Sequence, residues 1–161
     1  MVKKVIFLDR DGVINEERGD YTWRIEDFRF TDNLFEALSR IAEKGFEFVI
    51  VTNQGGIAKG LYGHEDVKRL NAIVSKEFKN HNLNLLDIYY SPYHSSISKS
   101  LSRKPDSLML EKAIDQYTID VSKSYMIGDS ERDILAAKKV GVKGILNKAN
   151  TSLTTIVDQI N

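Results

Sequence analysis

The chain has 161 residues, of which 42% are hydrophobic and 29% charged, a composition that predicts one compact domain spanning residues 1–161. Lysine and arginine total 23, as do aspartate and glutamate, so the formal net charge is zero, which excludes a general attraction to nucleic acid or to an anionic membrane. No cysteine is present, which excludes disulfides, thiolate nucleophiles and thiolate zinc sites.

Short β-rich runs alternate with longer amphipathic segments along the chain, which predicts βαβ units and a mostly parallel sheet. The runs are apolar at both odd and even positions, so we expect helices to cover both faces of every strand. This pattern predicts an α/β fold with three layers and a Rossmann-like sheet. The predicted strands are residues 2–8, 46–51, 86–90, 124–127 and 144–146.

Amphipathic segments between these strands predict helices with recognisable ends. Thr31 or Asp32 is expected to cap the first helix, and Gly45 to end it in the left-handed conformation. Two long segments, residues 16–30 and 91–103, have no clean period and are predicted to be loops of the kind that often carry function. The predicted helices are residues 31–45, 64–80, 104–117, 130–140 and, more weakly defined, 152–160.

Two carboxylates follow the first predicted strand directly, in the segment Asp9-Arg10-Asp11-Gly12. Ligands of open α/β sheets bind outside the carboxyl ends of the strands, so both acids are expected at the edge where a site would form. At this spacing one can act as a nucleophile bound to a metal and the other as a proton donor and acceptor. A polar strand end without function is the alternative, because short motifs also arise by chance.

Two further segments carry groups suited to binding an anion. Residues 52–56, Thr-Asn-Gln-Gly-Gly, follow a strand and offer a hydroxyl, side-chain amides and free backbone N–H groups. Arg103 and Lys104 bring two cations to the predicted start of a helix, whose N-terminus favours negative charge. Taken singly, the first segment also fits an ordinary turn and the second an ordinary charged surface.

The fourth strand end carries an acid that helix capping does not explain. Ser130 and Asp133 are predicted to form a capping box, which accounts for both. Asp129 has no such role and is expected on the same rim as Asp9 and Asp11. Three carboxylates there would repel one another unless a cation joined them, which favours an octahedral magnesium site.

Taken in order, four groups of residues resemble the four motifs of the haloacid-dehalogenase (HAD) superfamily of phosphatases: Asp9 with Asp11, Thr52, Lys104, and Asp129 with Asp133. The resemblance spans residues 3–146. The segments DRDGVIN, VTNQGGIAKG and RKP, which begin at residues 9, 51 and 103, are similar to the branch without a cap domain that contains D,D-heptose 1,7-bisphosphate phosphatases and histidinol-phosphate phosphatases. About 40 residues separate Gly12 from Thr52, too few for a cap domain.

The resemblance implies that Asp9 is the nucleophile that forms an aspartyl-phosphate and that Asp11 protonates the leaving oxygen and then activates water. It also implies Mg²⁺ bound by the carboxylates of Asp9 and Asp129 and the backbone carbonyl of Asp11. Cations are needed so that the anionic carboxylate can approach the phosphate dianion, because one close pair of like charges costs about 4 kcal/mol at an effective dielectric constant near 20. The implied substrate-binding and phosphate-binding residues are Thr52, Asn53, Gln54, Gly55, Arg103, Lys104, Ser130, Glu17, Arg18, Gly19 and Asp20.

The chain departs from these relatives at a zinc-binding loop, where they carry Cys-x-His followed by Cys-x-Cys-Arg-Lys-Pro. Serine hydroxyls are poor zinc ligands and a tyrosine does not replace an imidazole, so we predict no structural zinc. Without zinc, the loop must be either mobile or held by the packing of side chains such as Tyr90 and Tyr93. At Ser130, many relatives carry a lysine that contacts phosphate. The positions matching the zinc ligands are Ser91, Tyr93, Ser100 and Ser102.

These expectations favour a Mg²⁺-dependent phosphatase that acts on a sugar bisphosphate. The first candidate substrate is D-glycero-D-manno-heptose 1,7-bisphosphate. Arg103 and Arg18 favour a bisphosphate, because a second phosphate needs a second cationic grip. Histidinol phosphate is the alternative substrate and would instead need carboxylates and an apolar surface. Two other hypotheses are a phosphate-binding domain without catalysis and a polynucleotide 3′-phosphatase. The neutral net charge argues against the second.

The expected partner is therefore a small phosphorylated sugar, with no nucleic acid and no membrane, and we expect a monomer. The first residues contain too short an apolar run for a signal peptide. No stretch approaches the roughly 18 apolar residues of a membrane-spanning helix. A cytoplasmic location is the resulting expectation.

Overall fold

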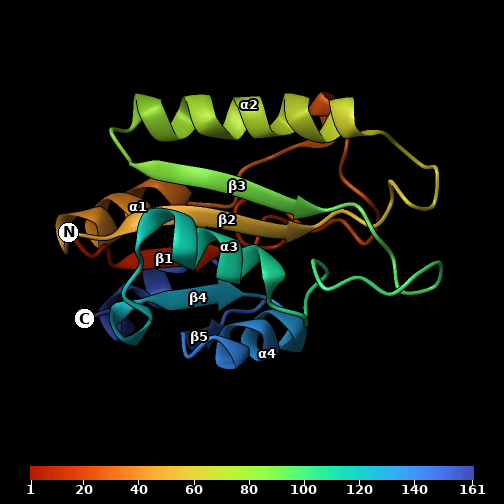
Figure 1. The fold of residues 1–161 in the computed structure, drawn as a ribbon. Helices are drawn as coiled ribbons and strands as arrows, with labels where there is room; N and C mark the ends of the chain where they lie inside the picture. Colours follow the sequence, from red (N-terminus) through yellow and green to blue (C-terminus); the bar gives the residue numbers. More distant parts are fainter.

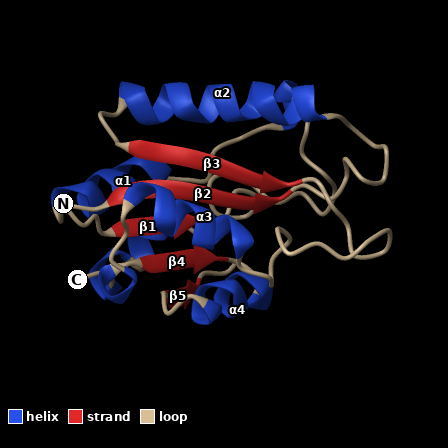
Figure 2. Ribbon diagram, in the orientation of Figure 1, coloured by secondary structure: helices blue, strands red, loops and turns tan.

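The computed structural model describes residues 1–161 and contains one five-stranded parallel sheet between layers of helices (Figures 1 and 2). The strand order is β3-β2-β1-β4-β5, so the first strand lies at the centre. The predicted α/β arrangement is confirmed. The elements are β1 (Val5–Leu8), α1 (Leu34–Glu43), β2 (Glu47–Asn53), α2 (His64–Asn80), β3 (Leu85–Ser91), α3 (Leu108–Tyr117), β4 (Tyr125–Gly128), α4 (Glu131–Lys139) and β5 (Lys143–Leu146).

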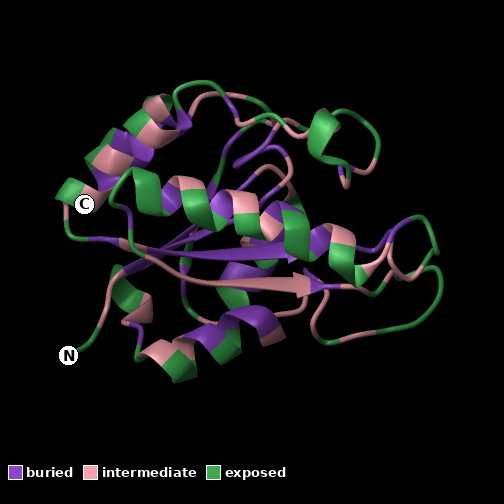
Figure 3. Cartoon of the chain, turned by 90° about the horizontal axis from the view of Figure 1, so that it is seen from above, coloured by how far each residue is buried: buried purple, intermediate pink, exposed green.

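Two hydrophobic clusters lie on opposite faces of this sheet. Ile6 and Leu8 of β1 pack in the cluster formed with α1, α2 and the C-terminal segment. Val5 and Phe7 pack in the cluster formed with α3 and α4. Successive residues of a strand point to opposite faces, so burial of all four shows that the central strand is covered on both sides. Figure 3 shows the buried central strands between helices with exposed outer faces.

The two edge strands are less buried than predicted. Residues 85–90 of β3 are only half-buried, and in β5 only Ile145 is buried. Each of these strands has a single neighbour in the sheet, so part of its surface faces solvent. Leu85 and Ile88 of β3 still pack on one hydrophobic cluster and Leu86 and Tyr89 on the other, so both faces of this strand are covered, but incompletely. The sequence did not predict this lower burial of the edge strands, because apolar composition alone does not give a strand's position in the sheet.

The expected cap of α1 is also wrong. Asn33 occupies the capping position with φ of 56°, and neither Thr31 nor Asp32 caps the helix with its side chain. The Thr31 hydroxyl donates instead to the backbone oxygen of Val13 at 2.8 Å, which ties the segment before the helix to the loop after β1. Gly45 ends the helix with φ of 88°, as predicted.

The third helix begins at Leu108, later than predicted. The backbone N–H and carbonyl of Lys104 are both bonded to the Asn53 side-chain amide, at 2.9 and 3.0 Å, so Lys104 is fixed to the end of β2 and does not start a helix. Asp106 does not cap the helix but accepts from Lys139 Nζ at 2.9 Å. The sequence pattern could not show these tertiary contacts.

The C-terminal helix predicted over residues 152–160 is replaced by two 3₁₀ turns, Leu153–Thr155 and Val157–Gln159. The Ser152 side chain accepts from the N–H of Thr154, and the Thr155 hydroxyl donates to the carbonyl of Ser152. Such local bonds compete with a regular helix. Between β1 and α1 the only regular element is the 3₁₀ turn Ile25–Asp27, so no cap domain lies there. None of the helices is both long and apolar enough to cross a membrane.

Phe78 joins α2 to the core and is expected to contribute strongly to stability. Its buried ring lies 5.9 Å from the ring of Phe35 and 5.7 Å from that of Phe48, measured between centroids. We expect Phe78→Ala to lower the free energy of unfolding by about 3–5 kcal/mol in urea denaturation, because it leaves a cavity. Leu135→Ala, on the exposed side of α4, serves as the control with a loss of about 1 kcal/mol or less. Equal losses would contradict this role of Phe78.

Candidate active site

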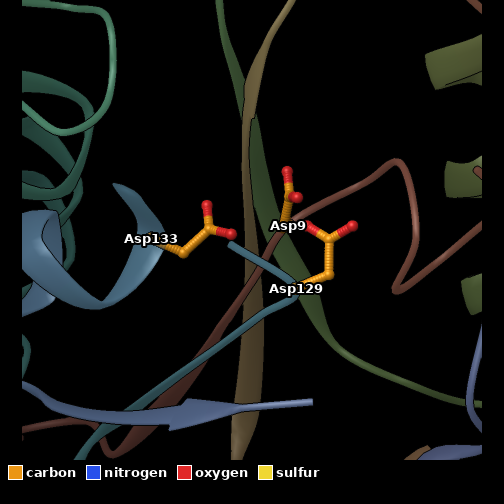
Figure 4. A group of neighbouring side chains, drawn as sticks. All are labelled: Asp9, Asp129 and Asp133. Atoms are coloured by element: carbon orange, nitrogen blue, oxygen red, sulfur yellow. The ribbon is translucent and has the colours of Figure 1, made fainter. Parts of the chain in front are cut away.

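The candidate site lies at the carboxyl ends of the three central strands. Asp9 follows β1, Asp129 follows β4, and Asp133 lies in the first turn of α4. Because β1 pairs with both β2 and β4, the strand order brings these acids together. Each has a carboxylate oxygen within 4.8 Å of the others, and Figure 4 shows them converging from three segments.

Lys104 is the buried cation of this site. Its Nζ donates to Asp9 Oδ1 at 2.9 Å, to Asp133 Oδ1 at 2.6 Å and to the carbonyl of Val51 at 2.8 Å. All three ammonium hydrogens therefore have acceptors. Burial alone would lower the pKa of Lys104, but its contacts with Asp9 and Asp133 outweigh that effect and hold the pKa above the ordinary value. The ammonium is therefore charged at neutral pH.

Asp9 and Asp129 place two carboxyl groups close together beside this lysine. Burial raises the pKa of Asp9 well above its ordinary value; Lys104 opposes the rise, and the neighbouring acids add to it. Burial also raises the pKa of Asp129. Asp9 Oδ1 accepts from Lys104 and from the N–H of Arg10, whereas no donor contacts its Oδ2. This set of oxygen donors fits a hard divalent cation such as Mg²⁺, held by Asp9 and Asp129.

Asp133 differs from the other two acids because both of its oxygens are already engaged. Oδ1 accepts from Lys104 and Oδ2 from the N–H of Ser130 at 3.1 Å. The predicted capping box with Ser130 is confirmed, but the contact with Lys104 is one that the sequence analysis missed. The sequence does hold a sign of this contact: Asp133 lies on the same face of the helix as Ala136 and Ala137, which are buried, so its carboxylate needs a buried partner. We interpret Asp133 as a residue that positions Lys104.

Asp11 is held by donors on both of its carboxylate oxygens. Oδ1 accepts from Arg10 Nη2 at 2.9 Å and from Asn15 Nδ2 at 3.0 Å, and Oδ2 accepts from Gln54 Nε2 at 3.0 Å. Arg10 is itself buried and also donates to the carbonyl of Thr22. The sequence analysis did not assign roles to Arg10 and Asn15. Asp11 is thus fixed in place at the edge of the cavity.

A cavity of about 480 Å³ opens over these acids. Of the predicted substrate-binding residues, Arg18, Thr52 and Gln54 do not line it. Arg18 lies 3.4 Å from Asp27 in an ion pair, and Thr52 and Gln54 are buried. The predicted residues that do line it are Asp9, Asp11, Glu17, Gly19, Asp20, Asn53, Gly55, Arg103, Lys104, Asp129 and Ser130.

Two arginines face this cavity without a carboxylate partner. Arg103 Nη1 donates to the carbonyl of Tyr93 at 3.0 Å, and neither Arg103 nor Arg132 forms an ion pair. Burial lowers the pKa of Arg103, and the charge of Arg132 lowers it further, so the two guanidinium groups are close enough to repel. The sequence analysis missed Arg132, whose only signal is its place in the first turn after Asp129. Both arginines also line a neighbouring cavity of about 370 Å³.

The loop after β3 is held by serine hydroxyls. Ser102 Oγ lies 2.8 Å from the hydroxyl oxygens of both Ser91 and Ser100. Of the alternatives that we considered, a mobile loop or one held by packing of Tyr90 and Tyr93, the structure does not support packing of Tyr93, because this residue is 46% exposed. Tyr90 instead bonds through its hydroxyl to His64 Nδ1 at 2.7 Å. The absence of structural zinc stays a prediction.

The chain is similar in sequence to known phosphatases. A model of HAD-hydrolase-like proteins matches residues 101–158. The chain is 39% identical over 145 residues to the D-glycero-alpha-D-manno-heptose-1,7-bisphosphate 7-phosphatase of Photorhabdus laumondii, which covers 86% of this chain and 79% of that protein. It is 38% identical over 149 residues to the D-glycero-beta-D-manno-heptose-1,7-bisphosphate 7-phosphatase of Haemophilus ducreyi, which covers 89% of this chain and 81% of that protein.

A solved structure shows the same fold at lower sequence identity. The D,D-heptose 1,7-bisphosphate phosphatase of B. bronchiseptica, complexed with magnesium and phosphate, has a TM-score of 0.86 and 22% identity. The match covers 97% of both chains. This likeness extends over the whole sheet and its helices, and it shows the fold.

Replacing Lys104 tests whether the buried acids depend on its charge. We expect Lys104→Met to lower the free energy of unfolding by about 3–5 kcal/mol in magnesium-free buffer, because Asp9 and Asp133 lose their buried cation. Lys139→Met removes a half-exposed ion pair with Asp106 and is the matched control, with a loss of about 1 kcal/mol or less. Urea denaturation measures both. If Lys104→Met is as stable as the control variant, the stability of the fold does not depend on the pairing of Lys104 with Asp9 and Asp133.

Proposed function

This chain belongs to the family of the D-glycero-D-manno-heptose-1,7-bisphosphate 7-phosphatases within the HAD-like hydrolases, and from that membership we propose its substrate and its catalytic residues. The protein is a phosphatase. We propose that it removes the 7-phosphate of heptose 1,7-bisphosphate with Mg²⁺ as cofactor. The observation that carries the proposal is the convergence of Asp9, Asp11, Lys104 and Asp129 on one cavity.

In the proposed mechanism, Asp9 attacks the phosphorus atom and forms an aspartyl-phosphate while the bond to the sugar oxygen breaks. Asp11 gives its proton to the departing oxygen, so the sugar leaves as an alcohol. Asp11 then takes a proton from water, which attacks the phosphorus, releases inorganic phosphate and restores the Asp9 carboxylate. The carboxylates of Asp9 and Asp129 and the backbone carbonyl of Asp11 would hold Mg²⁺, which would supply positive charge against the repulsion between carboxylate and phosphate.

The choice of a bisphosphate is supported by Arg103 and Arg132. Lys104 lies against Asp9 and can neutralise the reacting phosphoryl group, whereas the two arginines have no carboxylate partner of their own. A second phosphate of the substrate would offset their mutual repulsion and accept hydrogen bonds from planar guanidinium groups. Histidinol phosphate carries an imidazole and an ammonium group and would gain nothing from this pair.

The substrate is tested by phosphate release from a panel. It contains both anomers of heptose 1,7-bisphosphate, fructose 1,6-bisphosphate and histidinol phosphate, first with Mg²⁺ and then with a chelator. We expect at least a tenfold preference for one heptose anomer, which corresponds to about 1.4 kcal/mol of differential transition-state binding. Chelation and Asp9→Asn should each abolish release. Turnover that survives Asp9→Asn would refute covalent catalysis, and a preference for histidinol phosphate would refute the substrate.

The second-phosphate site is tested by removing one arginine. We expect Arg132→Gln to lower at least tenfold the ratio of kcat/KM for heptose 1,7-bisphosphate to that for heptose 7-phosphate, because only the former carries the second phosphate. Lys138→Gln removes one positive charge from the exposed face of the same helix and should leave the ratio unchanged. Steady-state kinetics measure both. An unchanged ratio in Arg132→Gln would contradict this assignment.

A further inference from the structure

Gln54 lies behind the cavity and is the only donor to one oxygen of Asp11. Its side chain is 2% exposed and does not line the cavity, so it is poorly placed to bind substrate directly. Nε2 donates to Asp11 Oδ2 at 3.0 Å and to Thr52 Oγ1 at 2.9 Å. Oε1 accepts from the hydroxyl of Tyr62 at 2.7 Å. Both amide hydrogens and the amide oxygen are therefore engaged.

These contacts fix which way the Gln54 amide faces. A rotation of the amide by half a turn would place Oε1 against the Asp11 carboxylate and exchange a hydrogen bond for repulsion between two acceptors. The same rotation would turn Nε2 toward Tyr62. The carboxylate of Asp11 thus selects the orientation in which Gln54 presents a donor to it, and the Tyr62 hydroxyl, which can donate or accept, donates to Oε1 in that orientation.

Tyr62 is fixed from its other side by aromatic packing. Its ring lies 6.2 Å from Trp23 with an interplanar angle of 12° and 5.8 Å from Tyr21, measured between centroids. A Cβ atom at Gly56 would lie 2.1 Å from the Tyr62 ring, so glycine is required for this close approach. Burial raises the pKa of Tyr62, which keeps its hydroxyl protonated as a donor. Tyr21 lines the cavity, so a continuous series of contacts joins the cavity wall to Asp11.

The division of donors between the two Asp11 oxygens indicates what this arrangement does. Arg10 and Asn15 both donate to Oδ1, whereas Gln54 alone donates to Oδ2. An oxygen that already accepts two hydrogen bonds is poorly suited to carry a proton. Oδ2 is therefore the oxygen better placed to exchange a proton, and Gln54 is its only donor.

We propose that Gln54 and Tyr62 are positioning residues that hold Asp11 Oδ2 in place for proton transfer to the leaving oxygen of the substrate. The inference rests on the proposed phosphatase mechanism, in which Asp11 protonates that oxygen. Neither residue lines the cavity. Gln54 acts on Asp11 directly, and Tyr62 acts through Gln54 and joins it to the aromatic loop of Tyr21 and Trp23.

The dependence of rate on the leaving group distinguishes this role from a general structural one. A sugar alkoxide must be protonated as it leaves, whereas p-nitrophenolate departs without a proton. For Gln54→Leu and Tyr62→Phe we expect kcat/KM for the best alkyl phosphate of the panel to fall at least tenfold more than kcat/KM for p-nitrophenyl phosphate. Gln54→Glu keeps the side-chain length but places a carboxylate against Asp11, and it should show the same selective loss.

The chain supplies a matched control in a second tyrosine–glutamine pair. The Tyr89 hydroxyl donates to Gln116 Oε1 at 2.9 Å on the surface, away from the cavity. Tyr89→Phe and Gln116→Leu should leave the ratio of the two kcat/KM values unchanged. Circular-dichroism melting establishes that each variant is folded.

The possible outcomes distinguish the positioning role of Gln54 and Tyr62 from the proposed phosphatase function. An active wild type whose Gln54 and Tyr62 variants lose both activities equally, or lose neither, overturns the positioning role and leaves the phosphatase proposal standing. A wild type that releases no phosphate from any substrate overturns both. A selective loss with the alkyl phosphate in the folded Tyr62→Phe variant, absent from Tyr89→Phe, supports the inference even where a Gln54 variant fails to fold.

Discussion

The buried ammonium group of Lys104 is the interaction on which the site depends. It joins Asp9 after β1, the carbonyl of Val51 in β2 and Asp133 in α4, so one cation fixes three separate elements. Such a network adds little net stability, because the cost of removing ions from water offsets their attraction. Its contribution is geometric. The backbone of Lys104 is held in turn by Asn53, so the cation cannot move away from Asp9.

The parallel sheet makes this convergence possible. Because all strands run in one direction, the segments that follow β1, β2 and β4 leave from one edge, where the loops in Figure 1 extend beyond the strands. Gly12 permits a close approach of two segments at this end of the sheet. It has φ of 91°, and a Cβ atom there would lie 2.2 Å from Asp129 Oδ2. The absence of a side chain at this position lets Asp129 lie beside the segment that carries Asp9 and Asp11.

The sequence predicted the fold class, the order of the elements and the strand ends that carry acids, because these depend on local periodicity and on polar residues that follow apolar runs. It could not predict contacts that depend on position in the sheet, such as the exposure of β3. The partners of long polar side chains could not be predicted either. Gln54 was expected to bind substrate, yet it does not line the cavity and its amide is engaged with Asp11. Asn53 does line the cavity, but its amide also bonds to the backbone of Lys104, a partner distant in sequence that the pattern could not predict.

A structure determined with Mg²⁺ and beryllium trifluoride, a mimic of a carboxylate-bound phosphoryl group, would show directly which carboxylate carries the phosphoryl group. We expect beryllium bonded to a carboxylate oxygen of Asp9, a metal between Asp9 and Asp129, and Lys104 against the fluorides. A phosphoryl mimic attached to another carboxylate, or a metal bound away from Asp9 and Asp129, would contradict this expectation.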